Sequence, residues 1–177
     1  MKIAVFGGSF DPPHIGHIRI VQKALEELDI DLLIIVPTYL NPFKRSFAAP
    51  PQLRLRWLRK IFLSYKKVRI CDYEIRQNRP TYTIETIEYL KRRFAPKKIY
   101  LIIGSDNLPA LDQWYRYKKL RKMVEFVVAT RRGYRVRTRK YKILRVDVPI
   151  SSTALRQKPI RRYLPKLIAN EIIRFYS

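Results

Sequence analysis

The chain has 177 residues, of which 47% are hydrophobic and 12% aromatic, enough for one folded domain with a core and too few for two. Its 38 Lys and Arg residues against 14 Asp and Glu give a net charge of +24, so its surface attracts polyanions. No apolar run approaches the roughly 20 residues of a membrane span, and the single cysteine, Cys71, excludes an internal disulfide. We therefore expect one cytoplasmic domain over residues 1–177, with no membrane partner.

Apolar runs alternate with amphipathic stretches along the chain, which is typical of an α/β domain. We expect a Rossmann-like, doubly wound and mostly parallel sheet with helices on both faces. The predicted strands cover Lys2–Phe6, Leu32–Val36, Val68–Cys71, Ile99–Ile103, Phe126–Ala129 and Ile143–Val148. The predicted helices cover Gly16–Leu28, Pro51–Leu63, Ile84–Phe94 and Lys166–Tyr176, with Thr83 as an N-cap and Pro165 in the first turn of the last helix.

The first predicted strand runs into a segment rich in Gly and Pro, Gly7-Gly8-Ser9-Phe10-Asp11-Pro12-Pro13-His14-Ile15-Gly16-His17. Such a turn brings bare backbone N–H groups to a phosphate at a helix N-terminus, and Gly7 and Gly8 permit close approach of an anion. His14 and His17 lie one helical turn apart, so both should face whatever the loop holds. The segment predicts a polyphosphate site.

A metal site is the alternative for this segment, because His14 and His17 together with Asp11 could supply three ligands. These two are the only histidines of the chain, and no cluster of Cys or His elsewhere completes a zinc shell. We therefore expect no protein-bound metal.

Two further segments follow predicted strands. The Pro-rich stretch Pro37–Pro51 is a long loop, and long loops in compact domains usually cover sites. Gly104-Ser105-Asp106 ends the fourth strand, where Asp106 can hold ribose hydroxyls, and Trp114 is either part of the core or a flat face for a ring. Ligands in parallel α/β folds bind outside the carboxyl ends of the strands, so these loops and residues 7–14 should share one rim.

Much of the positive charge falls in two stretches, Arg116–Lys122 and Arg131–Arg145, of which the second holds eight Lys and Arg and no acid. Neither stretch carries a known nucleic-acid-binding motif. We expect a solvated basic face that steers nucleotides, with any nucleic-acid binding non-specific.

A last segment of interest is Ile150-Ser151-Ser152-Thr153-Ala154-Leu155-Arg156, which opens a helix. Hydroxyls and free N–H groups at its start, with the Arg156 guanidinium one turn on, suit a triphosphate. An N-cap alone would explain a serine at this position but not the arginine.

Residues 7–17 resemble the G-G-S-F-D-P-P-H-x-G-H string of the nucleotidyltransferase superfamily, in the form most similar to bacterial nicotinate-nucleotide adenylyltransferases. Three more segments resemble that family's motifs in the expected order: Pro80–Thr86 (P-S/T-Y-T-x-x-T), Gly104–Trp114 (G-x-D, seven residues, W) and Ile150–Arg156 (I-S-S/T-T-x-x-R).

The loop after the second predicted strand departs from the family's P-N-x-x-P-P-H-K pattern. Lys44 keeps its place, but Thr38 stands for the asparagine and Phe43 for the histidine. A polar side-chain contact from position 43 is therefore excluded.

The resemblance implies adenylyl transfer from ATP to nicotinate mononucleotide, giving deamido-NAD and pyrophosphate, with Mg²⁺ carried on the ATP phosphates. A phosphomonoester has a second pKa of about 6 and is mostly dianionic at neutral pH, so the acceptor needs no general base. We expect catalysis from in-line positioning and charge neutralisation by His14, His17, Lys44 and Arg156. The predicted ATP contacts are Gly7, Gly8, Ser9, Phe10, His17, Gly104, Asp106, Ser151, Ser152, Thr153 and Arg156. The predicted acceptor contacts are Ser9, Lys44, Thr81, Tyr82, Thr83, Asp106, Trp114 and Tyr115.

Two other functions stay open on the sequence. Another nucleotidyltransferase of the same superfamily would keep the first and last motifs and take nicotinamide mononucleotide or phosphopantetheine as acceptor. A non-catalytic protein on this fold that binds RNA or another polyanion would rest on the net charge of +24. Assembly into a homo-oligomer is likewise left open.

Overall fold

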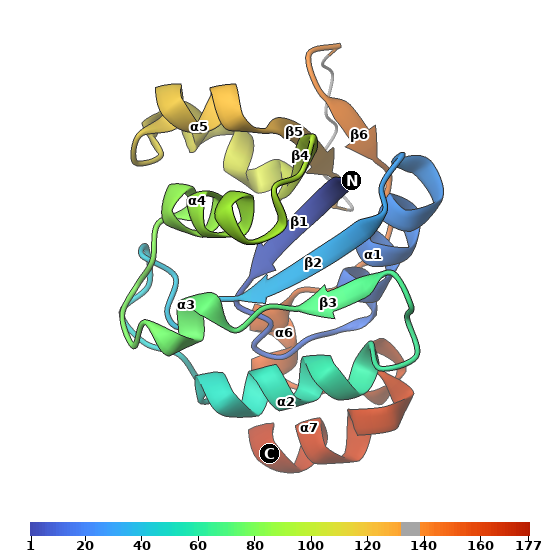
Figure 1. The fold of residues 1–177 in the computed structure, drawn as a ribbon. Helices are drawn as coiled ribbons and strands as arrows, with labels where there is room; N and C mark the ends of the chain where they lie inside the picture. Colours follow the sequence, from blue (N-terminus) through green and yellow to red (C-terminus); the bar gives the residue numbers. More distant parts are fainter. Residues whose placement is uncertain (132–138) are drawn as a thin grey trace.

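A computed structural model of the chain describes residues 1–131 and 139–177. Its centre is a sheet of six parallel strands in the order β3-β2-β1-β4-β5-β6 (Figure 1). The strands are β1 Lys2–Gly8, β2 Leu32–Pro37, β3 Val68–Ile70, β4 Lys98–Gly104, β5 Glu125–Ala129 and β6 Lys142–Leu144. The α-helices are α1 Ile15–Glu27, α2 Pro51–Ile61, α3 Tyr73–Arg76, α4 Thr83–Phe94, α5 Tyr117–Met123, α6 Ser152–Gln157 and α7 Ala169–Tyr176, and 3-10 segments cover Ser105–Gln113, Arg161–Tyr163 and Lys166–Ile168.

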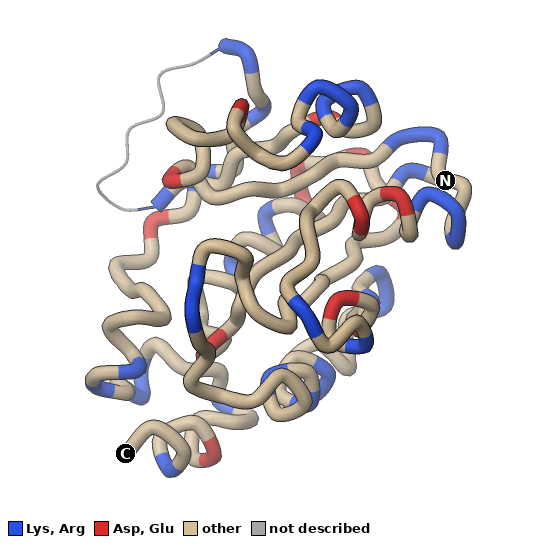
Figure 2. Tube along the Cα trace, turned by 90° about the vertical axis from the view of Figure 1, so that its left-hand side faces the viewer, with Lys and Arg blue, Asp and Glu red and all other residues tan. Residues whose placement is uncertain are grey.

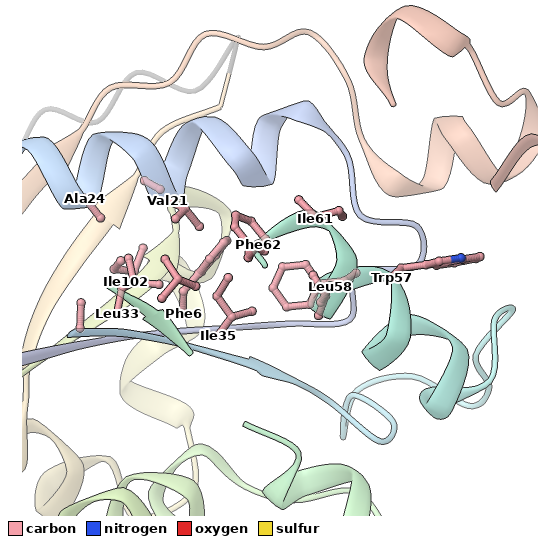
Figure 3. Close-up of a cluster of buried hydrophobic side chains, with 14 of the residues drawn as sticks. Phe6, Val21, Ala24, Leu33, Ile35, Trp57, Leu58, Ile61, Phe62 and Ile102 are labelled. Atoms are coloured by element: carbon pink, nitrogen blue, oxygen red, sulfur yellow. The ribbon is translucent and has the colours of Figure 1, made fainter. Parts of the chain in front are cut away.

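Strand β1 contributes side chains to both hydrophobic clusters of the molecule, because successive side chains of a strand point to opposite faces of the sheet. Ala4 and Phe6 belong to a cluster covered by α1 and α2, whereas Ile3 and Val5 belong to a cluster covered by α4 and α5. Figure 3 shows side chains of the first cluster filling the space between the sheet, α1 and α2. Helices therefore cover both faces, and the predicted doubly wound α/β fold is confirmed.

The strand order creates a switch point between β1 and β4. The chain builds outward from β1 through β2 to β3, then crosses back to place β4 on the other side of β1. The ladder between β1 and β4 ends at the pair Phe6 and Ile102, while Gly7 and Gly8 remain paired with β2. The two strands thus separate at their carboxyl ends, and a crevice at such a point is where parallel α/β folds bind ligands.

The predicted strand over residues 143–148 is too long, because the chain leaves the ladder after β6. The Thr130 N–H donates to the Leu144 carbonyl at 2.9 Å, but the next bond goes from the Val146 N–H to the Thr130 hydroxyl at 3.1 Å. A side chain therefore replaces the neighbouring backbone as the acceptor and ends the pairing.

The last predicted helix is also divided, and one predicted cap is displaced by a residue. Pro165 precedes a 3-10 turn in which the Ile168 N–H donates to the Pro165 carbonyl at 3.1 Å, and α7 begins only at Ala169. Thr83 is the first residue of α4 rather than its N-cap, which is Tyr82. The Glu85 carboxylate accepts the Tyr82 N–H at 2.8 Å, an interaction that the prediction from Thr83 did not include.

Basic residues lie along helices and loops over much of the surface in the view of Figure 2. The basic stretch predicted over residues 131–145 includes residues 132–138, which lie outside the described residues. Among the helices that the structure describes, none combines the length and the apolar character needed to span a bilayer.

Candidate active site

The predicted site residues all line one cleft of about 800 Å³ at the carboxyl ends of β1 and β4. Residues from five separate segments meet there, and their individual roles stay predictions. They are Gly7, Gly8, Ser9, Phe10, His14 and His17 of the first segment, Lys44 after β2, Thr81, Tyr82 and Thr83 at the start of α4, Gly104, Asp106, Trp114 and Tyr115 after β4, and Ser151, Ser152, Thr153 and Arg156 around α6.

The two histidines form a stacked pair at the start of α1. Nδ1 of His14 accepts the Gly16 N–H at 3.0 Å as the helix cap, and Nδ1 of His17 accepts the His14 N–H at 3.0 Å. The ring centroids are 3.8 Å apart. Because each Nδ1 is an acceptor, the proton of each neutral imidazole lies on Nε2.

Burial keeps this pair uncharged. It lowers the pKa of His14 to about 3, with a smaller contribution from the Arg131 guanidinium. Burial and then the neighbouring His14 hold the pKa of His17 well below its usual value. Both rings therefore offer neutral N–H donors to the cleft, and this state does not change across the physiological pH range.

Phe10 packs against the histidine pair. Its backbone has a φ of 51°, in the left-handed region that an aromatic residue rarely adopts, at a cost of about 1–3 kcal/mol. In this conformation its ring lies edge-on to His17, with centroids 4.8 Å apart, and also packs against Phe6. The ring is 2% exposed, so the packing of the histidine offsets the backbone cost.

Asp11 is a scaffold residue, because its carboxylate bonds to two other parts of the chain. Its carboxylate accepts the N–H groups of Ala48 at 2.8 Å and Ala49 at 2.9 Å, and it also accepts the Tyr176 hydroxyl. The residues of the described ranges include no group of three His, Cys, Asp or Glu placed to hold a metal ion. The carboxylate is thus turned toward main-chain donors and the last helix, and the absence of a protein-bound metal stays a prediction.

Arg54 is a buried scaffold residue that the sequence interpretation missed. It is 1% exposed, and its guanidinium donates to four main-chain carbonyls of the loops after β1 and β2. These are Ser9 at 2.7 Å, Thr38 at 2.8 Å, Tyr39 at 2.9 Å and Ala49 at 3.0 Å. The sequence did contain a signal for the burial of Arg54. This residue stands four positions before Leu58 and seven before Ile61, which is the spacing of the buried stripe of α2.

Helix α6 is hydrogen bonded directly to the first segment. The Ser152 hydroxyl donates to the Pro12 carbonyl at 2.8 Å, and the Arg156 guanidinium donates to the Asp11 carbonyl at 2.8 Å and to the Thr153 hydroxyl at 3.2 Å. A guanidinium has five N–H donors, so others remain for the cleft. The first and last motifs thus form one wall of the site.

Lys44 adds a second cation beside Arg156. Its Nζ lies 3.5 Å from the Ser9 hydroxyl, and burial followed by the nearby Arg156 lowers its pKa. Lys44 and Arg156 together make this part of the cleft electropositive. A bound polyphosphate would relieve their repulsion.

The opposite end of the cleft is aromatic. The rings of Tyr82 and Tyr115 stack with centroids 4.5 Å apart, and no described residue accepts the backbone N–H of Thr83 or Tyr115. Trp114 packs against the second core cluster and also lines the cleft, and its stacking on a ligand ring stays a prediction. This end offers unpaired donors beside flat apolar faces.

Glu74 is a second residue that the sequence interpretation missed. It lies on α3, is 7% exposed and lines the cleft, and its carboxylate accepts the Thr86 hydroxyl at 2.7 Å. Burial raises its pKa to about 7. The four-residue helix that carries it is too short to leave a clear periodic pattern in the sequence.

Comparison with known proteins defines the class. The cytidylyltransferase-like family model matches residues 5–158, and the chain therefore belongs to that family. A solved structure titled Plasmodium falciparum nicotinic acid mononucleotide adenylyltransferase complexed with NaAD has the same fold, with a TM-score of 0.79 at 22% identity over 98% of this chain and 95% of that one.

Within the family, its relatives are nicotinate-nucleotide adenylyltransferases. A protein of a Nitratiruptor species named "Probable nicotinate-nucleotide adenylyltransferase" is 68% identical over 99% of both chains. One of the same name from Aliarcobacter butzleri is 52% identical over 98% of this chain and 96% of its own length. These identities over nearly the full length place the chain with the bacterial nicotinate-nucleotide adenylyltransferases, as its motifs predict.

The Gly16→Ala variant tests the histidine cap. An added Cβ would lie 2.7 Å from Cε1 and 2.9 Å from Nδ1 of the His14 ring, so the ring must leave its capping position. We expect kcat to fall at least about tenfold and stability to fall by about 1 kcal/mol, as for a lost N-cap. In the matched Gly7→Ala variant the new Cβ meets only the Val36 carbonyl, at 3.7 Å, so the melting temperature should not change. A Gly16→Ala enzyme with wild-type kcat would contradict the assigned function of the cap.

The Glu74→Gln variant tests the buried carboxyl. The pKa of Glu74 rises from 4.5 to about 7 on folding, so between these values the folded chain binds more protons than the unfolded one and stability falls as pH rises. Glutamine removes this loss, and the variant should gain stability over wild type between pH 5 and pH 8 in urea unfolding. Glu85→Gln is the opposite control, because a hydrogen bond from Arg79 lowers the pKa of Glu85. The ionised Glu85 therefore stabilises the folded wild type above its ordinary pKa of 4.5, and this contribution is lost as the pH falls. Parallel curves for wild type and Glu74→Gln would refute the shift.

Proposed function

We propose that this chain joins nicotinate mononucleotide to the AMP part of ATP, forming deamido-NAD and releasing pyrophosphate. The observation that carries the proposal is the meeting of the first and last motifs in one electropositive cleft, through the bonds from Ser152 to Pro12 and from Arg156 to Asp11. Support also comes from the names of relatives up to 68% identical over the full length.

The chemistry needs no base from the protein. An oxygen of the acceptor phosphate attacks the α-phosphorus of ATP, and the bond from that phosphorus to the oxygen bridging to the β-phosphate breaks. The nucleophile is already dianionic at neutral pH, with a pKa of about 6, so no proton has to be removed. The cleft has to hold the two anions in line and to stabilise the charge on the departing pyrophosphate.

Fixed donors suit this task. The Nε2–H groups of His14 and His17 are held by the cap, and no described residue accepts the backbone N–H of Ser9 or Phe10. Donors already in place cost little reorganisation when charge develops in the transition state. We assign these four groups, with Lys44 and Arg156, to the triphosphate and the transferring phosphorus, and the aromatic end of the cleft to the acceptor.

Mg²⁺ fits this cleft only as an ion that travels with ATP. The carboxylate of Asp11 accepts the Ala48 and Ala49 N–H groups, and the carboxyl of Glu74 accepts the Thr86 hydroxyl, which leaves Asp106 as the remaining carboxylate of the described cleft lining. We therefore assign no residue of this chain as a protein ligand of the ion. On the phosphates, Mg²⁺ neutralises charge on the leaving pyrophosphate.

The proposal includes a cytoplasmic location, where ATP and mononucleotides are available. It requires no second copy of the chain, because every assigned contact lies within one cleft of one chain. Nucleic acid is not part of the proposed function, and any binding by the basic surface is assigned to non-specific attraction.

Acceptor preference tests the proposal. The N–H groups of Thr83 and Tyr115 can pair with a carboxylate, whereas an amide NH₂ would leave a donor facing donors, at about 1–3 kcal/mol per group. The enzyme should therefore prefer nicotinate mononucleotide over the nicotinamide form by at least about tenfold in kcat/KM. Trp114→Ala should lower kcat/KM for both acceptors and leave their ratio unchanged, because stacking does not distinguish the rings. A wild-type ratio near one, measured by pyrophosphate release, would refute the acceptor assignment.

His17→Ala tests the assigned donor. Loss of one donor to the transition state should lower kcat about 10²–10³-fold. His17→Asn separates the two functions of the ring, because its side-chain oxygen can still accept the His14 N–H but it has no Nε2–H. Asn should therefore restore the melting temperature and not kcat. If Asn restored kcat as well, the contribution of His17 would be to the cap alone.

A further inference from the structure

The last helix of the chain is bonded to the loop that carries the first motif. The Tyr176 hydroxyl, on α7, donates to the carboxylate of Asp11, which lies 165 residues earlier. Asp11 is 4% exposed, and its other carboxylate partners are the N–H groups of Ala48 and Ala49. One buried carboxylate thus joins the loop after β1, the loop after β2 and the last helix.

The position of Asp11 determines the geometry of its neighbours in the site. Ser9 and Phe10, whose N–H groups we assign to phosphate, come directly before it. Its main-chain carbonyl accepts the Arg156 guanidinium at 2.8 Å. A small displacement of Asp11 would therefore move the N–H groups of Ser9 and Phe10 and the guanidinium of Arg156 together.

Helix α7 does not depend on this bond for its docking. The Glu171 carboxylate accepts the Trp57 indole N–H at 3.1 Å and pairs with the Lys60 ammonium at 2.7 Å. The rings of Trp57 and Tyr176 also lie with centroids 6.0 Å apart. The helix would remain packed on α2 if the tyrosine lost only its hydroxyl.

We propose that Tyr176 is a positioning residue of this enzyme: its hydroxyl fixes the Asp11 carboxylate and so holds the phosphate-facing loop in its productive geometry. The inference rests on the adenylyl transfer proposed above. Burial raises the pKa of the tyrosine, which keeps the hydroxyl protonated and able to donate at any working pH.

The hydroxyl also limits the attraction between the Asp11 carboxylate and the Lys44 ammonium. The charge of Asp11 acts on Lys44, whose ammonium we assign to phosphate. Without the tyrosine donor, Oδ1 of Asp11 keeps only the Ala49 N–H as a partner, and the carboxylate is less firmly held away from that ammonium. Both effects predict slower turnover rather than unfolding.

Tyr176→Phe tests the proposal, because it removes one oxygen atom and keeps the ring against Trp57. We expect kcat to fall about tenfold to a hundredfold, as for a misplaced reacting group, with KM values changed less than about threefold and the melting temperature within about 4 °C. Glu171→Gln is the matched control, since it weakens the docking of the same helix at a point away from the loop. It should lower the melting temperature and leave kcat within about twofold.

Three results would overturn the proposal. The first is a wild-type kcat in Tyr176→Phe, and the second is a loss of kcat in both variants in proportion to their losses of stability. The third is failure of Tyr176→Phe to fold by circular dichroism, which would make the hydroxyl a general element of the fold.

The wild-type assay separates this inference from the function on which it rests. If wild type does not convert ATP and nicotinate mononucleotide to pyrophosphate and a dinucleotide, the function itself is refuted. If wild type does so and Tyr176→Phe matches it, only the positioning role is lost.

Discussion

Two buried charges hold the site in shape, the carboxylate of Asp11 and the guanidinium of Arg54. Both bond mainly to main-chain groups of loops that have few backbone bonds of their own. A buried charge is costly unless its hydrogen bonds are made, so a loop that moved away would leave an unpaired ion at a cost of several kcal/mol. The loops after β1 and β2 are therefore fixed without being strands or helices, and the cleft between them is formed in advance of any ligand.

The histidine pair reconciles two demands that usually conflict. A helix N-terminus needs an acceptor for its free N–H groups, whereas a phosphate site needs donors. An imidazole meets both, because Nδ1 of His14 and of His17 accepts from backbone while each Nε2 keeps its proton. The positive potential then comes from Lys44 and Arg156, and the histidines add direction without adding charge.

The sequence was sufficient for the fold class, for every strand to within a few residues, and for a set of site residues that all line one cleft. Periodicity and motif spacing are local properties, and these features follow from them. The hydrogen-bond partners of the scaffold residues were not accessible in this way. Arg54 looks like one more base in a basic chain, Tyr176 like part of an amphipathic helix, and Glu74 like a surface acid. Their partners are main-chain groups or side chains from other elements, which become neighbours only when the sheet closes.

The bond between Tyr176 and Asp11 has a consequence for the order in which the protein is made. At ribosomal rates of about 5–20 residues per second, the 165 residues between them take on the order of 10–30 s to synthesise. During that time the first motif exists without the last helix, and for most of it without Ser152 and Arg156 as well. A nascent chain therefore carries the nucleotide-binding loop long before that loop can bind nucleotide well. Competence therefore requires residues 152–176 to have been made.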